Sequence, residues 1–409
     1  MAKKVNLLVK ALEDKDGILK LAPTWVPRDF LTPGRRLKLA PEDIYALGVR
    51  RGGIDERWLA STVKANNPGA PEDEGLSYVV VGEGDRTEKV LLKEAISEFG
   101  DTILGKNVMH KYGGWTVLTK FFDNECPIPF HLHQKEEHAQ KVGQSSKPEA
   151  YYFPVQLNII EGKFPYTFLG LNPGTQKNDI KKCLERWEQG DNGVLAYSQA
   201  YRLEPGTGWL IQAGILHAPG TLVTYEVQKA SDIYAMYQSM LEGKPVSKDL
   251  LLSNVPPELR SNLDYIVDMI DWEVNVYPEF KKHHYAKPVF TEPPKETEKD
   301  GYIQKWIVYG TEEFSAKELT VFPRSKVKIR DEAAYGLVVI QGHGEIGKFE
   351  VESPTMIRFG ELTNDELFVS VEAAREGVKI VNKSKVENLV MLKHFGPGNP
   401  AVPKTLNNA

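Results

Sequence analysis

The chain has little cysteine. Cys126 and Cys183 are its two cysteines among 409 residues, too few for a disulfide framework or for a zinc site built on cysteines. This scarcity favours a reducing compartment, and we expect a cytoplasmic protein. Any metal site must then be built from histidine and carboxylate side chains.

An excess of basic residues and long apolar runs are also missing. Lys and Arg number 51 and Asp and Glu number 56, so the formal net charge is −5. A protein that binds nucleic acid through a broad surface usually carries a basic excess. No apolar run approaches the roughly 18 residues of a membrane span, and charge at Lys10 and Glu13 is unlike a secretory signal. We therefore expect neither nucleic acid nor a membrane as a partner.

The segments that are present have mostly the pattern of short strands. From Trp115, segments such as WTVLTKFF and TLVTYEVQ are β-branched and aromatic, and Gly, Pro or Asn bounds each of them. This pattern is typical of an antiparallel sandwich or barrel, and it returns at Tyr302. The sequence therefore predicts a mainly β chain with two β domains.

Helical and irregular segments surround these strands. Residues 20–75 are rich in Pro, Gly and charge, which predicts loops around a short helix near Pro41. Residues 88–104 have the apolar spacing of an amphipathic helix. A helical insertion at about 174–190 opens with Asn178 or Asp179 as its cap. We place a first domain at 1–240, a helical and Pro-rich connector at 241–300, and a second domain at 301–409.

Four residues form a candidate metal site. His131 and His133 lie in PIPFHLHQ, and strand residues two apart point to the same face. Glu149 begins the next strand-like segment, EAYYF, and His217 lies in the turn QAGILHAPG. Three imidazoles and one carboxylate suit zinc, and they also suit Fe, Mn, Co or Ni. We predict one divalent metal ion at these four residues, with zinc as the first choice.

This pattern resembles the cupin superfamily, and two such β domains in one chain resemble a bicupin. The local sequence resembles type I mannose-6-phosphate isomerases. The resemblance begins in HLHQKEEHAQKVGQSSKPEAYY, through His131, His133, Ala139, Lys147 and Glu149. QAGILHAPG resembles the turn that carries the last metal-binding His of that family.

Three further segments extend the resemblance over roughly residues 50–240. YEVQKASD resembles the family's Glu-x-Gln-x-x-Ser-Asp strand, GGIDERWLAS resembles its Gly-Glu-x-Trp-x-x-Ser segment, and LLKEAISEFGDTILG resembles its Leu-rich helix. The resemblance implies two cupin (jelly-roll) barrels, with helical insertions attached to the first and with a second, degenerate barrel that binds no metal. It also implies a metal-dependent aldose–ketose isomerase that acts on a sugar or sugar phosphate through an enediol.

The sequence departs from the family pattern at three positions. His131 stands where the family has Gln, Pro129 where it has a substrate-contacting Ser, and Ala235 follows Tyr234 where it has a catalytic Arg. The nearest substitute for that Arg is Arg202, which we expect to bind substrate.

The resemblance also assigns a catalytic role to Lys147, which matches the family's Lys. An enediolate needs nearby positive charge, and Lys147 lies two residues from Glu149 on the same strand face. The residues do not single out a general base, since His138, Glu204 and Tyr225 are equal candidates.

Two other functions fit the same residues. A cupin-type Fe-dependent dioxygenase also uses three His and one Glu. A non-catalytic sugar-binding cupin fits the loss of the family's Arg. The substrate in the isomerase hypothesis is a small carbohydrate.

Overall fold

The computed structural model describes residues 2–82, 87–160 and 164–406. Their strands form five sheets, which confirms the prediction of a mainly β chain. The sheets are open ones, and none closes on itself within the described ranges. Among the same residues, no helix is long and apolar enough to cross a membrane.

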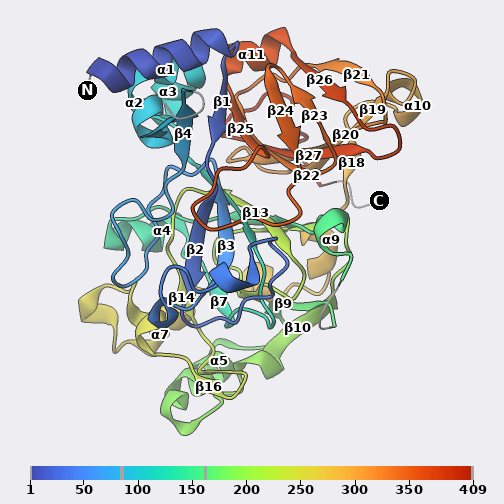
Figure 1. The fold of residues 1–409 in the computed structure, drawn as a ribbon. Coiled ribbons are helices and arrows are strands. Elements are labelled where there is room, and N and C mark those ends of the chain that lie inside the picture. The colour runs from blue at the N-terminus through green and yellow to red at the C-terminus, as the bar shows by residue number, and fades with distance from the viewer. Residues whose placement is uncertain (1, 83–86, 161–163, 407–409) are drawn as a thin grey trace.

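Two sheets form the N-terminal half of the molecule (Figure 1). The seven-stranded sheet has the order β17 (Tyr285–Ala286), β11 (Gly208–Ile211), β8 (Glu149–Tyr152), β13 (Thr224–Lys229), β6 (Val117–Phe122), β3 (Gly53–Leu59) and β2 (Thr24–Arg28). The five-stranded sheet has the order β10 (Ser198–Arg202), β9 (Tyr166–Leu171), β12 (His217–Ala218), β7 (His131–Leu132) and β14 (Ala235–Met236).

Two further sheets form the C-terminal half. The nine-stranded sheet has the order β18 (Val289–Phe290), β19 (Tyr302–Val308), β20 (Ser315–Val321), β27 (Leu389–Phe395), β22 (Tyr335–Gln341), β25 (Glu366–Val369), β1 (Ile18–Leu21), β4 (Tyr78–Val81) and β5 (Glu88–Leu91). The four-stranded sheet has the order β21 (Lys326–Ile329), β26 (Val378–Asn382), β23 (His343–Ile346) and β24 (Phe349–Glu352). A small hairpin joins β15 (Met240–Leu241) to β16 (Lys244–Pro245).

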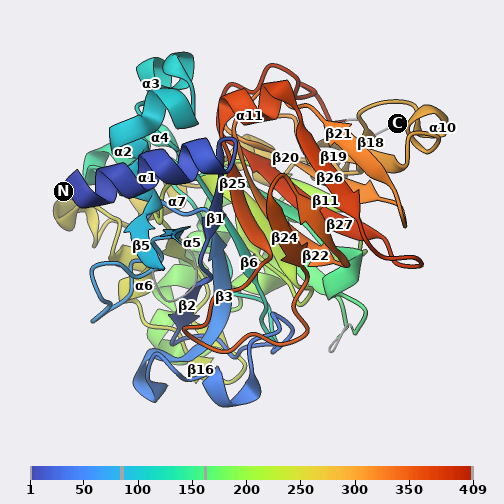
Figure 2. The same cartoon turned by 45° about the horizontal axis from the view of Figure 1, so that its top comes forward.

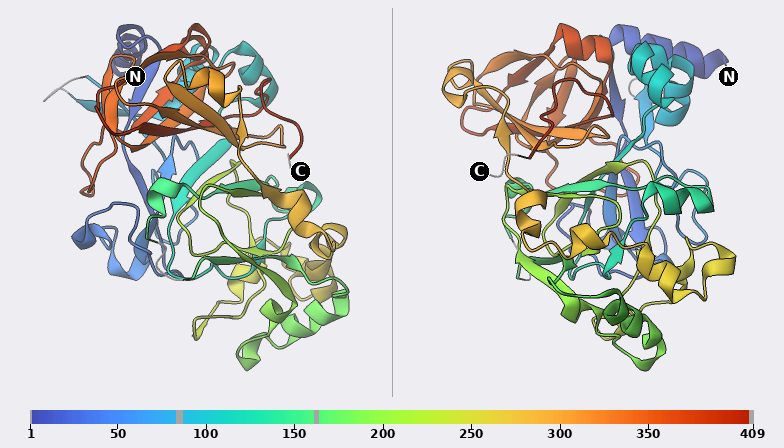
Figure 3. Two further views of the ribbon diagram at one scale, coloured as in Figure 1. Left: turned by 90° about the vertical axis from the view of Figure 1, so that its right-hand side faces the viewer. Right: turned by 180° about the vertical axis from the view of Figure 1, so that it is seen from behind.

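Apolar side chains bury each sheet against its neighbour. Phe122, Trp209 and Leu169 belong to a core between the seven- and five-stranded sheets. Because strand side chains alternate, Phe121 and Tyr225 face the other way and pack in the core shared with the nine-stranded sheet. The two halves therefore stack as β-sandwiches, which lie one above the other in Figure 3.

Helices cover the outside of these sandwiches. They are α1 (Ala2–Asp14), α2 (Leu92–Ile103), α3 (Lys106–Tyr112), α4 (Glu136–Ala139), α5 (Lys177–Glu185), α6 (Asp249–Leu252), α7 (Leu263–Asp268), α8 (Trp272–Asn275), α9 (Phe280–His284), α10 (Pro294–Thr297) and α11 (Val371–Glu376). Residues of α5, α6 and α7 pack with Phe130 and Leu132 on the outer face of the five-stranded sheet. The helix α5 lies in the predicted insertion.

Several local predictions were wrong. Residues 20–75 contain β2 and β3 in addition to loops, and residues 88–91 form the edge strand β5 ahead of α2. Gln176, and neither Asn178 nor Asp179, is the N-cap of α5, because Asp179 instead closes a capping box on it. His133 lies just after β7, which ends at Leu132.

The N-terminal segment contributes to both halves. Ile18 of β1 pairs with Val369 of β25, whereas β2, a few residues later, pairs with β3 in the other half. Figure 2 shows β1 beside β25, with α1 lying across the top of both. The domain boundaries proposed from the sequence remain a prediction, and this exchange of strands crosses them.

Candidate metal centre

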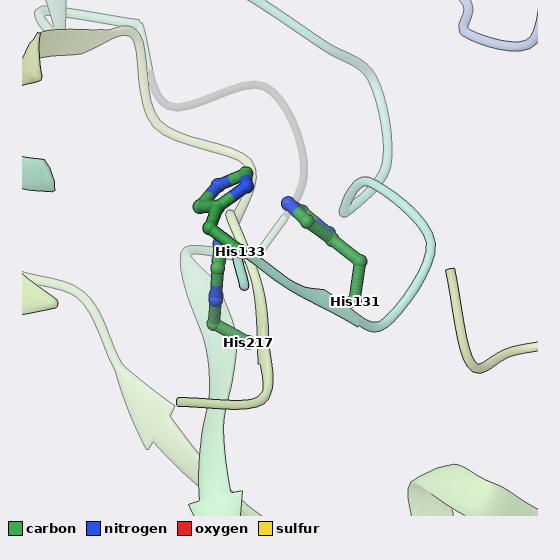
Figure 4. Close-up of side chains that lie close together, drawn as sticks. All are labelled: His131, His133 and His217. Atoms are coloured by element: carbon green, nitrogen blue, oxygen red, sulfur yellow. The ribbon is translucent and has the colours of Figure 1, made fainter. Parts of the chain in front are cut away.

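Three histidines meet on the inner face of the five-stranded sheet. His131 on β7 pairs directly with His217 on β12, and Phe130 and Leu132 point to the opposite, helix-covered face. One ligand nitrogen from each of the three imidazoles lies within 4.8 Å of the others. The ring centroids of His131 and His217 are 4.2 Å apart, and His133 lies 4.9 Å from His217. Figure 4 shows the three rings converging.

Backbone carbonyls fix the orientation of all three rings. The Nδ1 atom of His131 lies 2.7 Å from the carbonyl oxygen of Pro129, that of His133 lies 2.7 Å from Ile233, and that of His217 lies 2.8 Å from Ile215. A carbonyl accepts and does not donate, so each Nδ1 carries the proton. The neutral rings therefore turn their Nε2 lone pairs toward one another, as metal-binding histidines do.

Glu149 reaches the histidines from the opposite sheet. Its Oε2 lies 2.9 Å from Nε2 of His133, and its Oε1 lies 3.1 Å from Nε2 of His217. The hydroxyl of Tyr151, two residues along β8, donates to the same carboxylate. All of these side chains are almost completely buried. Three imidazoles from one sheet and one carboxylate from the facing sheet therefore surround one point in the core.

The buried acceptor atoms fit a divalent cation. Burial, together with the neighbouring imidazoles, holds the pKa of His131 well below its usual range. Burial and the ammonium of Lys147 lower the pKa of His133 to about 3. Lone pairs of neutral imidazoles thus face carboxylate oxygens, and Nε2 of His217 has no hydrogen-bond partner among the described residues. A cation bound at these atoms would satisfy them.

Lys147 adds a positive charge beside this cluster. Its Nζ lies 3.1 Å from Oε2 of Glu149 and 3.1 Å from Nε2 of His133. Burial alone would raise the pKa of the Glu149 carboxyl, but Lys147 and the two histidines hold it well below its usual range. Glu149 is therefore an anion at neutral pH.

A row of buried charges continues from Lys147 across the seven-stranded sheet. Lys147 lies 3.6 Å from Glu226, Glu226 lies 3.7 Å from Lys120, and Lys120 lies 3.2 Å from Glu56. The row follows the strand register, because Glu226 pairs with Tyr151 on one side and with Lys120 on the other. Arg28 closes the row, 3.3 Å from Glu56 and 3.8 Å from Asp232.

Within this row the two glutamates differ in protonation. Burial and the nearby Glu149 raise the pKa of Glu226 to about 7. Burial acts in the same direction on Glu56, but Arg28, Lys120 and the indole N–H of Trp58 lower its pKa to about 2. Glu226 is thus the carboxyl of the row that can exchange a proton near neutral pH.

Sequence reasoning missed Lys120, Arg28 and the role of Glu226. Lys120 is a single charge within the apolar strand segment WTVLTKFF, and Arg28 ends the apolar segment TWVPR. A charge inside an apolar strand is a usable signal, since a buried charge is retained only with a partner. The partners come from other strands, and the local sequence does not reveal them.

The structure does not bring the remaining candidates to the cluster. Arg202 is exposed on the edge strand β10, with its guanidinium 5.9 Å from the ring centroid of Phe164. His138 lies in α4 and packs on Tyr265. Glu204 is exposed near Tyr285, and Tyr225 points into the interface between the halves, with its hydroxyl 2.9 Å from Nδ1 of His394.

Comparison with known proteins reveals similarity in fold. The sequence matches no family model and none of the curated proteins. Among solved structures, the mannose 6-phosphate isomerase from Bacillus subtilis has a TM-score of 0.59 at 15% identity, covering 92% of this chain and 99% of that one. A variant of the phosphomannose isomerase from Salmonella typhimurium has a TM-score of 0.60 at 11% identity, covering 93% and 100%. A zinc-bound mannose 6-phosphate isomerase gives 0.60 at 12%, with the same coverage. The chain therefore shares their fold over nearly its whole length.

Proposed function

We propose that the protein is a metal-dependent aldose–ketose isomerase that acts on a sugar or sugar phosphate through an enediol. The observation that carries this proposal is the cluster of His131, His133, His217 and Glu149 with the ammonium of Lys147 in contact. It sits in a fold that is also found in zinc-bound mannose 6-phosphate isomerase.

In this proposal the four residues hold one divalent metal ion, with zinc as the first choice. A bound metal ion supplies a Lewis acid that polarises a sugar carbonyl. The protein contributes fixed positions for the ligands, because the rings are held by backbone carbonyls and Glu149 by Tyr151.

Lys147 and Glu226 supply the other two requirements of the reaction, charge stabilisation and proton transfer. The ammonium of Lys147 is buried beside the ligands, where it stabilises negative charge that develops on the enediolate. Glu226 lies 3.6 Å from Lys147, and its pKa of about 7 suits a group that takes a proton from one carbon and returns it to the next. We assign Glu226 as the general base.

The architecture supports the same proposal. The paired sheets of each half fit two cupin-type jelly rolls. We infer that the second half acts as a scaffold that closes the outer face of the seven-stranded sheet.

Proton exchange at C2 tests the proposed isomerase. The protein is stripped of metal, reloaded with zinc, and incubated in deuterated water with aldoses, ketoses and their phosphate esters. We expect deuterium at C2 and sugar interconversion from the zinc-loaded protein, and neither from the stripped protein. The absence of both exchange and interconversion with every sugar, at full zinc occupancy, would refute the proposal.

The two other functions predict different results from the same preparation. An Fe-dependent dioxygenase would consume oxygen after loading with iron. A non-catalytic binding protein would bind sugar in calorimetry without exchanging the C2 proton. Purified protein analysed for metal content distinguishes zinc from iron at the outset.

A further inference from the structure

Every buried cation of the charged row is already paired with carboxylates. Arg28, Lys120 and Lys147 lie on or beside the inner face of the seven-stranded sheet and are 5–6% exposed. Each faces two carboxylates at 3.1–3.8 Å. The carboxylates are those of Glu56, Glu149, Glu226 and Asp232. Three cations face four carboxylates, and Glu226 exchanges a proton near neutral pH, so the row sums to between 3 − 4 = −1 and 3 − 3 = 0 before the charge of a metal ion is counted.

A phosphate group needs a different environment. Sites for phosphate esters use Arg or Lys donors that are available for short, charge-assisted hydrogen bonds. Beside Arg28, Lys120 or Lys147, a phosphate dianion would also lie against the carboxylates that already hold these cations, and like charges repel strongly at such distances. A sugar hydroxyl adds no charge, and it can donate to the carboxylate and accept from the cation of one pair.

A cavity of about 530 Å³ lies against the Arg28 end of the row. Its charged lining residues are Arg28, Lys244, Asp29 and Glu242, so the charges sum to 2 − 2 = 0. Hydroxyl and amide side chains, among them Asn67 and Tyr234, complete its polar lining. Asn67 accepts a hydrogen bond from Arg28 at 3.1 Å, which connects the cavity wall to the row.

We propose that the substrate is an uncharged aldose or ketose, recognised through its hydroxyl groups, and not a phosphate ester. This inference rests on the proposed isomerase function and specifies its substrate class. Paired cations and a neutral cavity favour ligands that hydrogen-bond without bringing charge. The same arrangement selects against phosphate esters of the same sugars.

The test compares matched pairs of substrates. Zinc-loaded protein is assayed for C2 deuterium exchange with hexoses and pentoses and with the terminal phosphate ester of each. We expect kcat/KM for the best free sugar to exceed that for its phosphate ester by at least tenfold. An equal or higher value for the phosphate ester overturns this inference and leaves the isomerase function intact. Neither exchange nor isomerisation with any member of the panel refutes the isomerase function, and the inference fails with it.

A variant tests whether the pairing of charges causes the selection. Asp232→Asn removes one of the two carboxylates that face Arg28 and retains the shape of the side chain. We expect the ratio of phosphate-ester to free-sugar activity to rise at least threefold. Asp264→Asn, which removes an exposed partner of Lys181, is the matched control and should leave the ratio unchanged. An unchanged ratio in Asp232→Asn would show that these charges do not set the preference.

Discussion

Replacing Asp331 by Asn should strongly destabilise the C-terminal half. Lys317 on β20 and Lys393 on β27 are directly paired across neighbouring strands, and like charges in this position repel. Asp331 lies between them, with Oδ1 2.7 Å from Nζ of Lys317 and Oδ2 2.6 Å from Nζ of Lys393. All three side chains are buried. The variant would leave two buried ammonium groups facing a neutral amide.

The size of the loss in stability depends on whether the two lysines can release their protons. Breaking a buried ion pair by removing one partner costs about 3–5 kcal/mol. Lys393 limits the loss, because burial lowers its pKa to about 8 even beside Asp331, and without that anion it gives up its proton more readily. Releasing a proton costs about 1.4 kcal/mol for each unit of pKa shift. We therefore expect a loss near the lower end, about 3 kcal/mol in the free energy of unfolding.

Urea and thermal unfolding, followed by tryptophan fluorescence, measure this loss. Trp306 is a suitable reporter, since Nζ of Lys317 lies 4.4 Å from its ring centroid. For a unit of 150–250 residues, about 3 kcal/mol lowers Tm by roughly 6–12 °C. Asp264→Asn breaks an exposed pair and should cost less than about 1 kcal/mol. Adding Lys393→Met to Asp331→Asn should recover part of the loss.

Changing pH provides a second readout of the same cluster. The pKa of Lys393 in the folded protein, about 8, is below the ordinary value for an unfolded chain, roughly 10.4. The unfolded chain therefore binds more protons between these values, and the contribution of Lys393 to stability rises with pH in that window. A free energy of unfolding for Asp331→Asn that lies within about 1 kcal/mol of the parent value would refute the reasoning about this cluster.

Three predictions concern the metal centre. His133→Ala should lower bound zinc at least tenfold in metal analysis. The control His283→Ala, which changes an exposed ring beside Tyr277, should retain its zinc. Equal zinc content in the two variants would contradict the ligand assignment. Lys147→Met should retain zinc but lower kcat by about 10²–10³-fold, as expected for loss of one stabilising group. An unchanged kcat would exclude Lys147 as the group that stabilises the enediolate. For Glu226 as base, kcat/KM should rise with pH as its carboxyl loses a proton, and Glu226→Gln should remove this rise together with most of the activity.

The part of the site that lies close together in the sequence could be predicted. His131 and His133 share a face because strand alternation is a local rule, and Lys147 and Glu149 follow the same rule. Only His217 is distant, and its place in a Gly- and Pro-containing turn beside a strand indicated a functional loop. Local rules and a recognisable pattern were therefore enough for the ligand candidates.

The charged row could not be predicted, because tertiary pairing creates it. Lys120, Glu226 and Tyr151 become neighbours through the register of β6, β13 and β8, and register depends on the whole sheet. For the same reason the position of Arg202 could not be predicted, and its role in substrate binding stays a prediction. In the sequence, Arg202 lies on the strand-like segment before the turn that carries His217. In the structure it is exposed on the edge strand β10.

Two errors in the fold have a related cause. The strands β2 and β3 lie in a segment rich in Pro, Gly and charge, and Arg28, Glu56 and Arg57 made it look like a loop. These charges are buried in ion pairs, with Arg57 held by Asp365 at 2.7 Å. Composition indicates exposure only when charges lack such partners. In contrast, α5 was predicted because its helical pattern lies within nine residues of sequence.

The pairing of β1 with β25 determines how the chain can be divided and how it must fold. A fragment that begins at residue 301 would lack β1, β4 and β5, and it would expose the edge of β25 as a row of unpaired backbone groups. Such edges recruit other strands and aggregate. During synthesis, β1 emerges hundreds of residues before its partner, so the nine-stranded sheet can be completed only after nearly the whole chain has been made. We therefore expect truncation at either end to yield insoluble protein.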